Sequence, residues 1–257
     1  MTCEQTPTRS ISIDQAQLLS TWHHEETGLL ISCSTLPAET IFTAHTMLSE
    51  MKTAWPDMYG HCIRTASIAQ SLARRLDLPA EERDQLTIAA LLHDFGKTGL
   101  EKEFSHYENL EKPEQDALRI AHVRNGFEAI RDRIGKEVAS IMVAHHEFPQ
   151  PVCRSYPRNK NIPEEQRNGN ERRITPDASL EQLQALCALA DQIDAMTDET
   201  RPRNNGLQLI QTESHILTNI QSGQYWPESI RPLLPELVHE ALTVLNQRFL
   251  TRVDRTA

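Results

Sequence analysis

Apolar residues recur at helical spacing along most of this chain. Between Pro37 and Ala54, for example, Ile41, Ala44 and Leu48 share one helical face. Prolines at 56 and 79 stand where new helices would begin, since a proline in the first turn costs no intrahelical hydrogen bond. The pattern predicts helices over residues 37–54, 56–76, 79–96, 113–134 and 136–147, from 180 past 191, and over 207–220 and 235–250.

The same pattern sets the expected fold class. Strand-like alternation, internal repeats and a glycine-rich phosphate loop are not evident, so we predict an all-α helical bundle. Residues 1–36 have weak periodicity and are interpreted as an N-terminal appendage of uncertain structure, leaving 37–257 as the main domain. Residues 148–178 are rich in proline, asparagine and arginine, which is typical of a long loop that is either functional or solvated.

Composition narrows the classes of protein further. The 257 residues are 39% apolar and 24% charged, as in soluble globular proteins, and contain no run of about 18 apolar residues that would span a membrane. The N-terminus lacks a secretory signal and the five cysteines are scattered, so we expect a cytoplasmic protein. A net charge of −10 argues against broad nucleic-acid binding but permits a small phosphate substrate held by metal ions.

Histidines and aspartates lie at the inward faces or the ends of several predicted helices. A lone inward histidine is commonly a hydrogen-bonded core residue, but helical bundles also build metal sites from side chains on facing helices. Imidazole and carboxylate ligands suit iron, manganese, zinc or nickel better than calcium, and their number exceeds the needs of one ion. The expected ligands, for two ions with scope for a third, are Asp57, His61, His93, Asp94, His122, His145, His146 and Asp191.

The order of these residues resembles that of the HD-domain metal-dependent phosphohydrolases, and the spacing is most similar to the HD-GYP branch. The residues that carry the resemblance are His61, His93-Asp94 in HDFGK, His122 in AHVRNG, His145-His146-Glu147 in AHHE, and Asp191 in LADQIDAMT, over roughly residues 45–205. The GYP segment is degenerate: HHEFPQPVCRSYP lacks the family's Asp-Gly, and Ser155 replaces the glycine before Tyr156. RPRNNG, from Arg201, stands in place of the usual R-P-Y-R.

The resemblance implies an HD-type bundle with a metal centre that favours iron or manganese, zinc and nickel remaining alternatives. It implies His122, His145 and His146 on one ion, and His61, His93 and Asp191 on the other, with Asp57 completing the second site or binding a third ion. Asp94 would bridge the pair, which would hold a hydroxide that attacks phosphorus. Asp194 and Asp198, near Asp191, are interpreted as structural support.

Basic residues are candidates for substrate binding. The resemblance favours Lys97 as a phosphate ligand and catalytic residue over a solvated lysine at a helix end. Arg124 is a further candidate. Arg154 and Arg158 belong to the basic stretch of the 148–178 loop, which would act either as a lid over an anionic substrate or as a solvated loop.

We therefore expect a phosphodiesterase that acts on a cyclic dinucleotide, such as cyclic di-GMP, or on a related nucleotide. Two alternatives remain open. One is a nucleotide phosphomonoesterase of the HD type, and the other is a metal-stabilised signalling or binding module that does not turn over.

Overall fold

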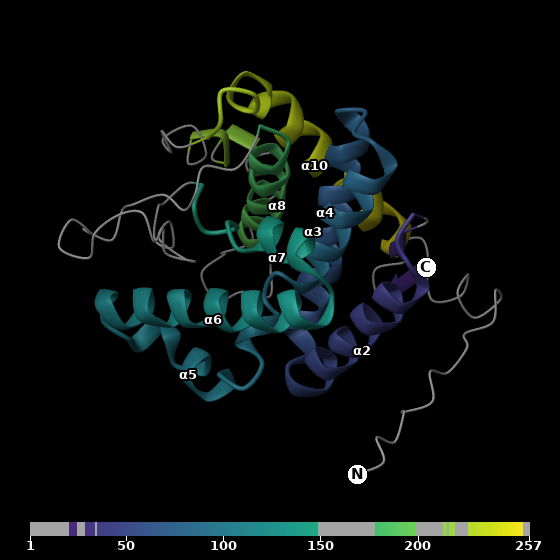
Figure 1. Ribbon diagram of the computed structural model, residues 1–257. Coiled ribbons are helices and arrows are strands. Elements are labelled where there is room, and N and C mark those ends of the chain that lie inside the picture. Colours follow the sequence, from purple (N-terminus) through teal and green to yellow (C-terminus); the bar gives the residue numbers. More distant parts are fainter. Residues whose placement is uncertain are drawn as a thin grey trace, which may run out of the picture.

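Helices make up nearly all of the regular structure (Figure 1). The computed structural model describes residues 21–24, 29–33, 35–148, 178–198, 213–214, 216–218 and 226–253. The longer helices are α2 (Ala38–Ala54), α3 (Pro56–Arg75), α4 (Ala80–Leu92), α6 (Lys112–Arg133), α7 (Lys136–Met142), α8 (Ala178–Thr197) and α10 (Leu234–Val253). Short α5 (Glu101–Ser105) and the 3-10 turns η1 (Phe95–Lys97), η2 (Tyr107–Asn109) and η4 (Arg231–Leu233) lie between them. The predicted all-α class is confirmed.

Helix α3 lies at the centre of the bundle and packs against α4 and α8 (Figure 1). Its buried positions include Gly60, Ala66, Ala69 and Ala73, small residues that let neighbouring helices approach closely. Helices α7 and α8 contact each other, and α7 also contacts α4 and α6. This packing places the ends of α4 and α7 beside the middle of α6 and α8, where the histidines and aspartates lie.

Two predicted helices end earlier than expected. Helix α4 stops at Leu92 rather than near Gly96, and α7 stops at Met142 rather than near Glu147. After α7 the chain continues in tight turns, in which the backbone N–H of His145 donates to Met142 O at 3.1 Å. Successive residues of a helix point about 100° apart, so leaving the helix allows two adjacent imidazoles to face one centre.

The N-terminal region, whose structure the sequence left uncertain, contains two short strands. Strands β1 (Thr21–His24) and β2 (Leu29–Ser32) form an antiparallel hairpin, with Thr21 opposite Ser32, and β2 contacts α3. TWHH and LLIS are each four residues long and do not alternate between apolar and polar, so periodicity could not reveal them.

Other predictions fall partly or wholly outside the described residues. The loop expected at 148–178 is described only at its ends, and of the helix expected over 207–220 only residues 213–214 and 216–218 are described. The division at residue 36 stays a prediction, although Cys33 belongs to the buried core. Among the described helices, none combines the length and the apolar character needed to cross a membrane.

Candidate metal centre

Six of the expected ligands form two groups of three within the bundle. His61, His93 and Asp94 form the first group, and in each group the potential ligand atoms all lie within 4.8 Å of one another. The second group is His122, His145 and His146, which come from α6 and from the turns after α7. Residues brought together from α3, α6 and the ends of α4 and α7 are therefore arranged as two adjacent candidate metal sites.

The carboxylate of Asp94 lies between the two groups. Its Oδ2 is 3.7 Å from His61 Nε2 and 3.4 Å from His93 Nε2. Its Oδ1 is 3.4 Å from His122 Nε2 and 3.8 Å from His145 Nε2. Each oxygen of this one carboxylate thus faces a different group of histidines.

Backbone carbonyls fix the orientation of three imidazoles. The Nδ1 atom of His93 contacts Ala90 O at 2.8 Å, that of His145 contacts Met142 O at 2.7 Å, and that of His122 contacts Leu118 O at 3.2 Å. A carbonyl oxygen only accepts hydrogen bonds, so each Nδ1 carries the proton. When the ring is neutral, Nε2 presents its lone pair to the centre, which is how metal-binding histidines are commonly held.

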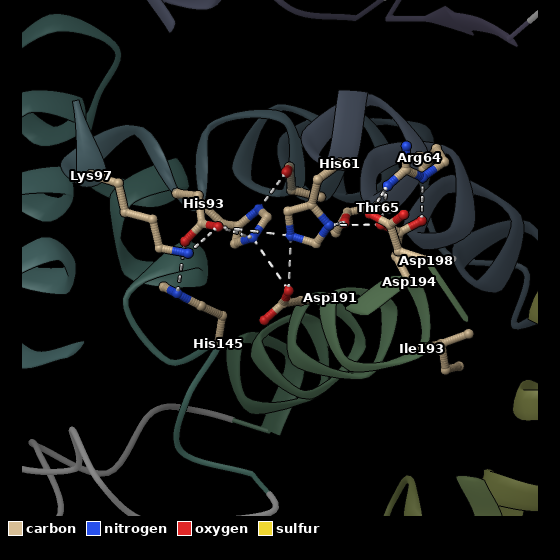
Figure 2. A network of polar contacts seen from close by, with 12 residues as sticks. His61, Arg64, Thr65, His93, Lys97, His145, Asp191, Ile193, Asp194 and Asp198 are labelled. Atoms are coloured by element: carbon tan, nitrogen blue, oxygen red, sulfur yellow. Dashed lines mark hydrogen bonds and ion pairs between the residues drawn. The ribbon is translucent and has the colours of Figure 1, made fainter. Parts of the chain in front are cut away.

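His61 is oriented by a carboxylate instead. Its Nδ1 lies 2.7 Å from Asp194 Oδ2, and its Nε2 lies 3.1 Å from Asp191 Oδ1 (Figure 2). Arg64 donates to Asp194 from Nε at 2.7 Å and from a terminal nitrogen at 3.0 Å. The same terminal nitrogen donates to Asp198 at 2.7 Å. Asp191 also reaches His93, with Oδ1 3.5 Å from Nε2.

Sequence reasoning did not single out Arg64 for this support. The available signal was its place three residues after His61, on the same face of α3. Asp194 and Asp198 accept its hydrogen bonds, and Asp194 thereby links Arg64 to His61. Asp194 therefore holds the ring of His61 directly, whereas Asp198 contacts Arg64 and not the ring.

The donor set fits a cation. The side chains of His93 and His122 are 0% exposed and that of Asp94 is 2% exposed. Within this buried group, His61 Nε2, His93 Nε2 and Asp94 Oδ1 have no hydrogen-bond partner, and the 3.1 Å approach of His61 to Asp191 does not have hydrogen-bond geometry. Unsatisfied buried polar atoms are costly, and divalent ions would satisfy these three.

The pKa values of His122, His145 and Asp94 favour the protonation states that metal binding needs. Burial, together with the charge of Lys97, places the pKa of His122 well below its usual range, and burial with the charge of His93 lowers that of His145 to about 4. Burial would raise the pKa of Asp94, but Lys97 and His93 outweigh it and hold that pKa well below its usual range. His122 and His145 are thus neutral, as metal ligands must be. Burial would lower the pKa of His93, but the charge of Asp94 outweighs it and raises that pKa, so His93 would give up a proton on binding an ion.

Comparison with protein families assigns the chain. The sequence model of the HD domain matches residues 58–196, more than half of the chain. The chain belongs to the HD domain family. This membership supports the predicted metal-dependent phosphohydrolase, and the two His/Asp groups described above could hold the metal. A search of curated proteins finds no match.

The HD domain fold is also found in solved structures. The HD domain of the phosphodiesterase PgpH from L. monocytogenes, in complex with cyclic-di-AMP, is 15% identical with a TM-score of 0.55, and the match covers 79% of this chain and 96% of that one. A structure of the same domain described without the nucleotide gives 15% identity and a TM-score of 0.54, covering 80% and 99%. At this identity the similarity shows a shared fold.

The other predicted site residues, Lys97, Asp57, Arg124, Arg154 and Arg158, belong to neither group of ligands. Lys97 lies beside the centre (Figure 2). Its Nζ donates to Asp94 Oδ2 at 2.6 Å. Asp57 is exposed in the first turn of α3 and belongs to neither group, so its role as a ligand stays a prediction. Arg124 is exposed on α6, while Arg154 and Arg158 lie outside the described residues. Their roles in substrate binding also stay predictions.

A glycine contact sets the distance between the HDFGK turn and α6. A Cβ atom built on Gly96 would lie 1.8 Å from His122 O and 2.4 Å from Gly126 N. Only a residue without a side chain lets the two backbones meet here. Asp94 and Lys97 are thus held against the helix that carries His122.

Proposed function

We propose that this protein is a metal-dependent phosphodiesterase that hydrolyses a cyclic dinucleotide or a related nucleotide. Family membership supports the broader class, a metal-dependent phosphohydrolase. The choice of a diester substrate is supported by the ordered ligand set, which resembles that of the HD-GYP branch. We assign the chain to that branch as a member with a degenerate GYP segment.

The position of Asp94 is the observation that carries the proposal. One carboxylate whose two oxygens face two separate histidine groups is the arrangement expected of a bridge between two cations. Two divalent ions, when bound, would activate water at neutral pH and neutralise the oxygens of the phosphate. Iron or manganese is the favoured pair for this mixture of imidazole and carboxylate ligands.

Lys97 would bind the substrate phosphate. Its ammonium donates to Asp94 in this structure, and its side chain is 15% exposed, so it lies between the buried ligands and solvent. An ammonium in that position can turn to a phosphate oxygen as a point charge. The ion pair with Asp94 keeps it close to the place where that oxygen would lie.

The test is hydrolysis by protein loaded with manganese or, under anaerobic conditions, with iron. The substrates are bis(p-nitrophenyl) phosphate, p-nitrophenyl phosphate, cyclic di-GMP and cyclic di-AMP. We include cyclic di-AMP because the L. monocytogenes HD domain of the same fold is described in complex with it. Asp94→Asn should lower bound metal and abolish turnover. Asp132→Asn is the matched control, since Asp132 pairs with Arg131 on the outside of α6.

Each outcome separates the candidate functions. Cleavage of the diesters supports the proposal, and the cyclic dinucleotide that is cleaved fastest names the substrate. Cleavage of p-nitrophenyl phosphate alone would replace it with a phosphomonoesterase. A protein that binds metal but cleaves none of these esters would be the non-catalytic module.

A further inference from the structure

A group of aromatic side chains lies beside the metal centre and outside the hydrophobic core. Phe104 of α5 stacks against Tyr107 of η2, with ring centroids 5.7 Å apart and planes inclined by 13°. Trp55, at the junction of α2 and α3, lies 6.3 Å from Phe104. We call Trp55, Phe104 and Tyr107 the aromatic group.

The aromatic group is partly exposed. Only 5% of residues are aromatic, and others such as Phe148 and Trp226 are fully buried and stacked on each other in the core. All three members of the aromatic group retain contact with solvent. Rings that gather at a surface without contributing to the core are typical of a binding site.

Phe104 joins the aromatic group to the phosphate side of the centre. Its ring packs edge-to-face with the ring of His122 at 5.7 Å. The ammonium of Lys97 lies 5.2 Å from the centroid of Phe104. A phosphate held by Lys97 would therefore place the rest of its molecule next to the aromatic group.

A second cation lies at the far side of the same rings. The guanidinium of Arg119 is 5.6 Å from the centroid of Tyr107 and 3.6 Å from Asp116. Two cations and three rings form a mixed surface in a protein of net charge −10. This combination matches a ligand that carries both a phosphate and a flat aromatic base. A sugar phosphate would contact the cations but has no flat base to contact the rings.

We propose that the aromatic group receives a nucleobase of the substrate, with Phe104 as the ring that sets the preference for nucleotides over other phosphate esters. The inference rests on the proposed function, because it places the phosphate of the base-bearing ligand at Lys97 and the metal centre. Bases stack on aromatic side chains with little regard to sequence, so both purines and pyrimidines would gain affinity here.

The test compares two ligands that differ only in the base. Non-hydrolysable phosphonate analogues of AMP and of ribose 5-phosphate are titrated calorimetrically into the manganese-loaded full chain. The wild type should bind the nucleotide analogue at least about ten-fold more tightly, on the scale of base–aromatic stacking. Phe104→Leu should remove most of that difference while leaving the affinity for the base-free analogue unchanged. Phe104→Tyr should retain the difference.

Control variants separate stacking from folding. Phe42→Leu changes a phenylalanine that is 51% exposed on α2, and it should leave both affinities unchanged. Trp55→Leu should weaken only the nucleotide analogue, and circular dichroism checks that each variant folds. Equal binding of the two analogues by the wild type would overturn the inference, as would a Phe104→Leu variant that keeps the full difference.

The outcome is independent of the proposed reaction. Base-dependent binding that is lost in Phe104→Leu, in a protein that hydrolyses no ester, would uphold the inference and refute the proposed function. Hydrolysis of phosphodiesters by a protein that binds both analogues equally would do the opposite.

Discussion

Asp194 accepts a hydrogen bond at 2.7 Å from Nδ1 of His61, a residue 133 positions earlier in the chain. The carboxylate is buried, and its pKa is lowered: burial alone would raise it, but the hydrogen bond and charge of His61, with Arg64, outweigh that effect. Asp194 thus stays ionised beside an imidazole whose other nitrogen faces Asp191. Such a carboxylate orients the ring and makes Nε2 a stronger electron donor.

Replacing Asp194 should therefore weaken metal binding without removing a ligand. We expect Asp194→Asn to lower the affinity for manganese by about 10- to 100-fold, measured by competition with a chromophoric chelator. Asp198→Asn is the control, because Asp198 is bonded to Arg64 and not to His61. The interpretation is wrong if the two variants lose the same affinity.

Gly96→Ala should be strongly destabilising. The added methyl group would overlap His122 O and Gly126 N, which are backbone atoms and cannot rotate away. We expect a loss of at least about 1–3 kcal/mol in the free energy of unfolding, the usual cost of overpacking, together with loss of metal. Urea denaturation with metal analysis measures both.

The matched control is Gly126→Ala on the facing helix. There the nearest atom to an added Cβ, at 2.9 Å, is the methyl carbon of Met142, at the end of a flexible side chain. This variant should cost less. If Gly126→Ala proved as damaging as Gly96→Ala, the close approach would not depend on the glycine in HDFGK.

The metal-free protein should lose stability as the pH falls from about 6.5 to about 4. The pKa of His145 drops from 6.5 to about 4 on folding, chiefly through burial, and those of His122 and His146 are also lowered. The unfolded chain takes up these protons first, so protonation favours unfolding throughout that interval. His93 acts in the opposite sense, because Asp94 overcomes burial and raises its pKa.

Urea midpoints measured across this pH range check the prediction. His145→Gln should flatten the slope, because the variant has no imidazole to protonate. A metal-free protein whose midpoint is constant from pH 6.5 to pH 4 would contradict the buried, neutral state of these rings.

Lys97→Met should retain metal and lose substrate affinity. The variant keeps the length of the side chain but removes the charge that would contact the phosphate. A hydrogen bond to a charged group contributes about 1.5–3 kcal/mol, so kcat/KM should fall by roughly 10- to 100-fold. Steady-state kinetics and metal analysis are the measurements, with Lys102→Met on exposed α5 as the control. Unchanged kinetics would show that Lys97 pairs with Asp94 but does not bind the substrate.

Much of the fold was predictable from the sequence because it depends on local periodicity. Prolines at 37, 56 and 79 marked the starts of α2, α3 and α4 to within a residue. The inward face of α3 carries His61 and the small residues expected there, and His93 directly follows α4. The ends of α4 and α7 could not be predicted in this way. They depend on contacts with α6 across the bundle, which no local pattern encodes.

The same distinction applies to the site. The set of candidate ligands followed from their residue types and inward phase, and the structure brings together His61, His93, Asp94, His122, His145, His146 and Asp191. Arg64 and Phe104 were missed because an arginine on α3 and a phenylalanine in a short helix have no chemistry of their own to mark them. Their positions become meaningful only beside Asp194 and His122.

Main-chain acceptors hold His93, His122 and His145, each from three or four residues earlier in the chain. A carbonyl oxygen is present whichever amino acid occupies that position. Substitutions at Ala90, Leu118 or Met142 therefore leave the orientation of these rings largely unchanged. The surrounding sequence can therefore change while the metal centre is retained. Selection that retains the centre acts mainly on the histidines themselves.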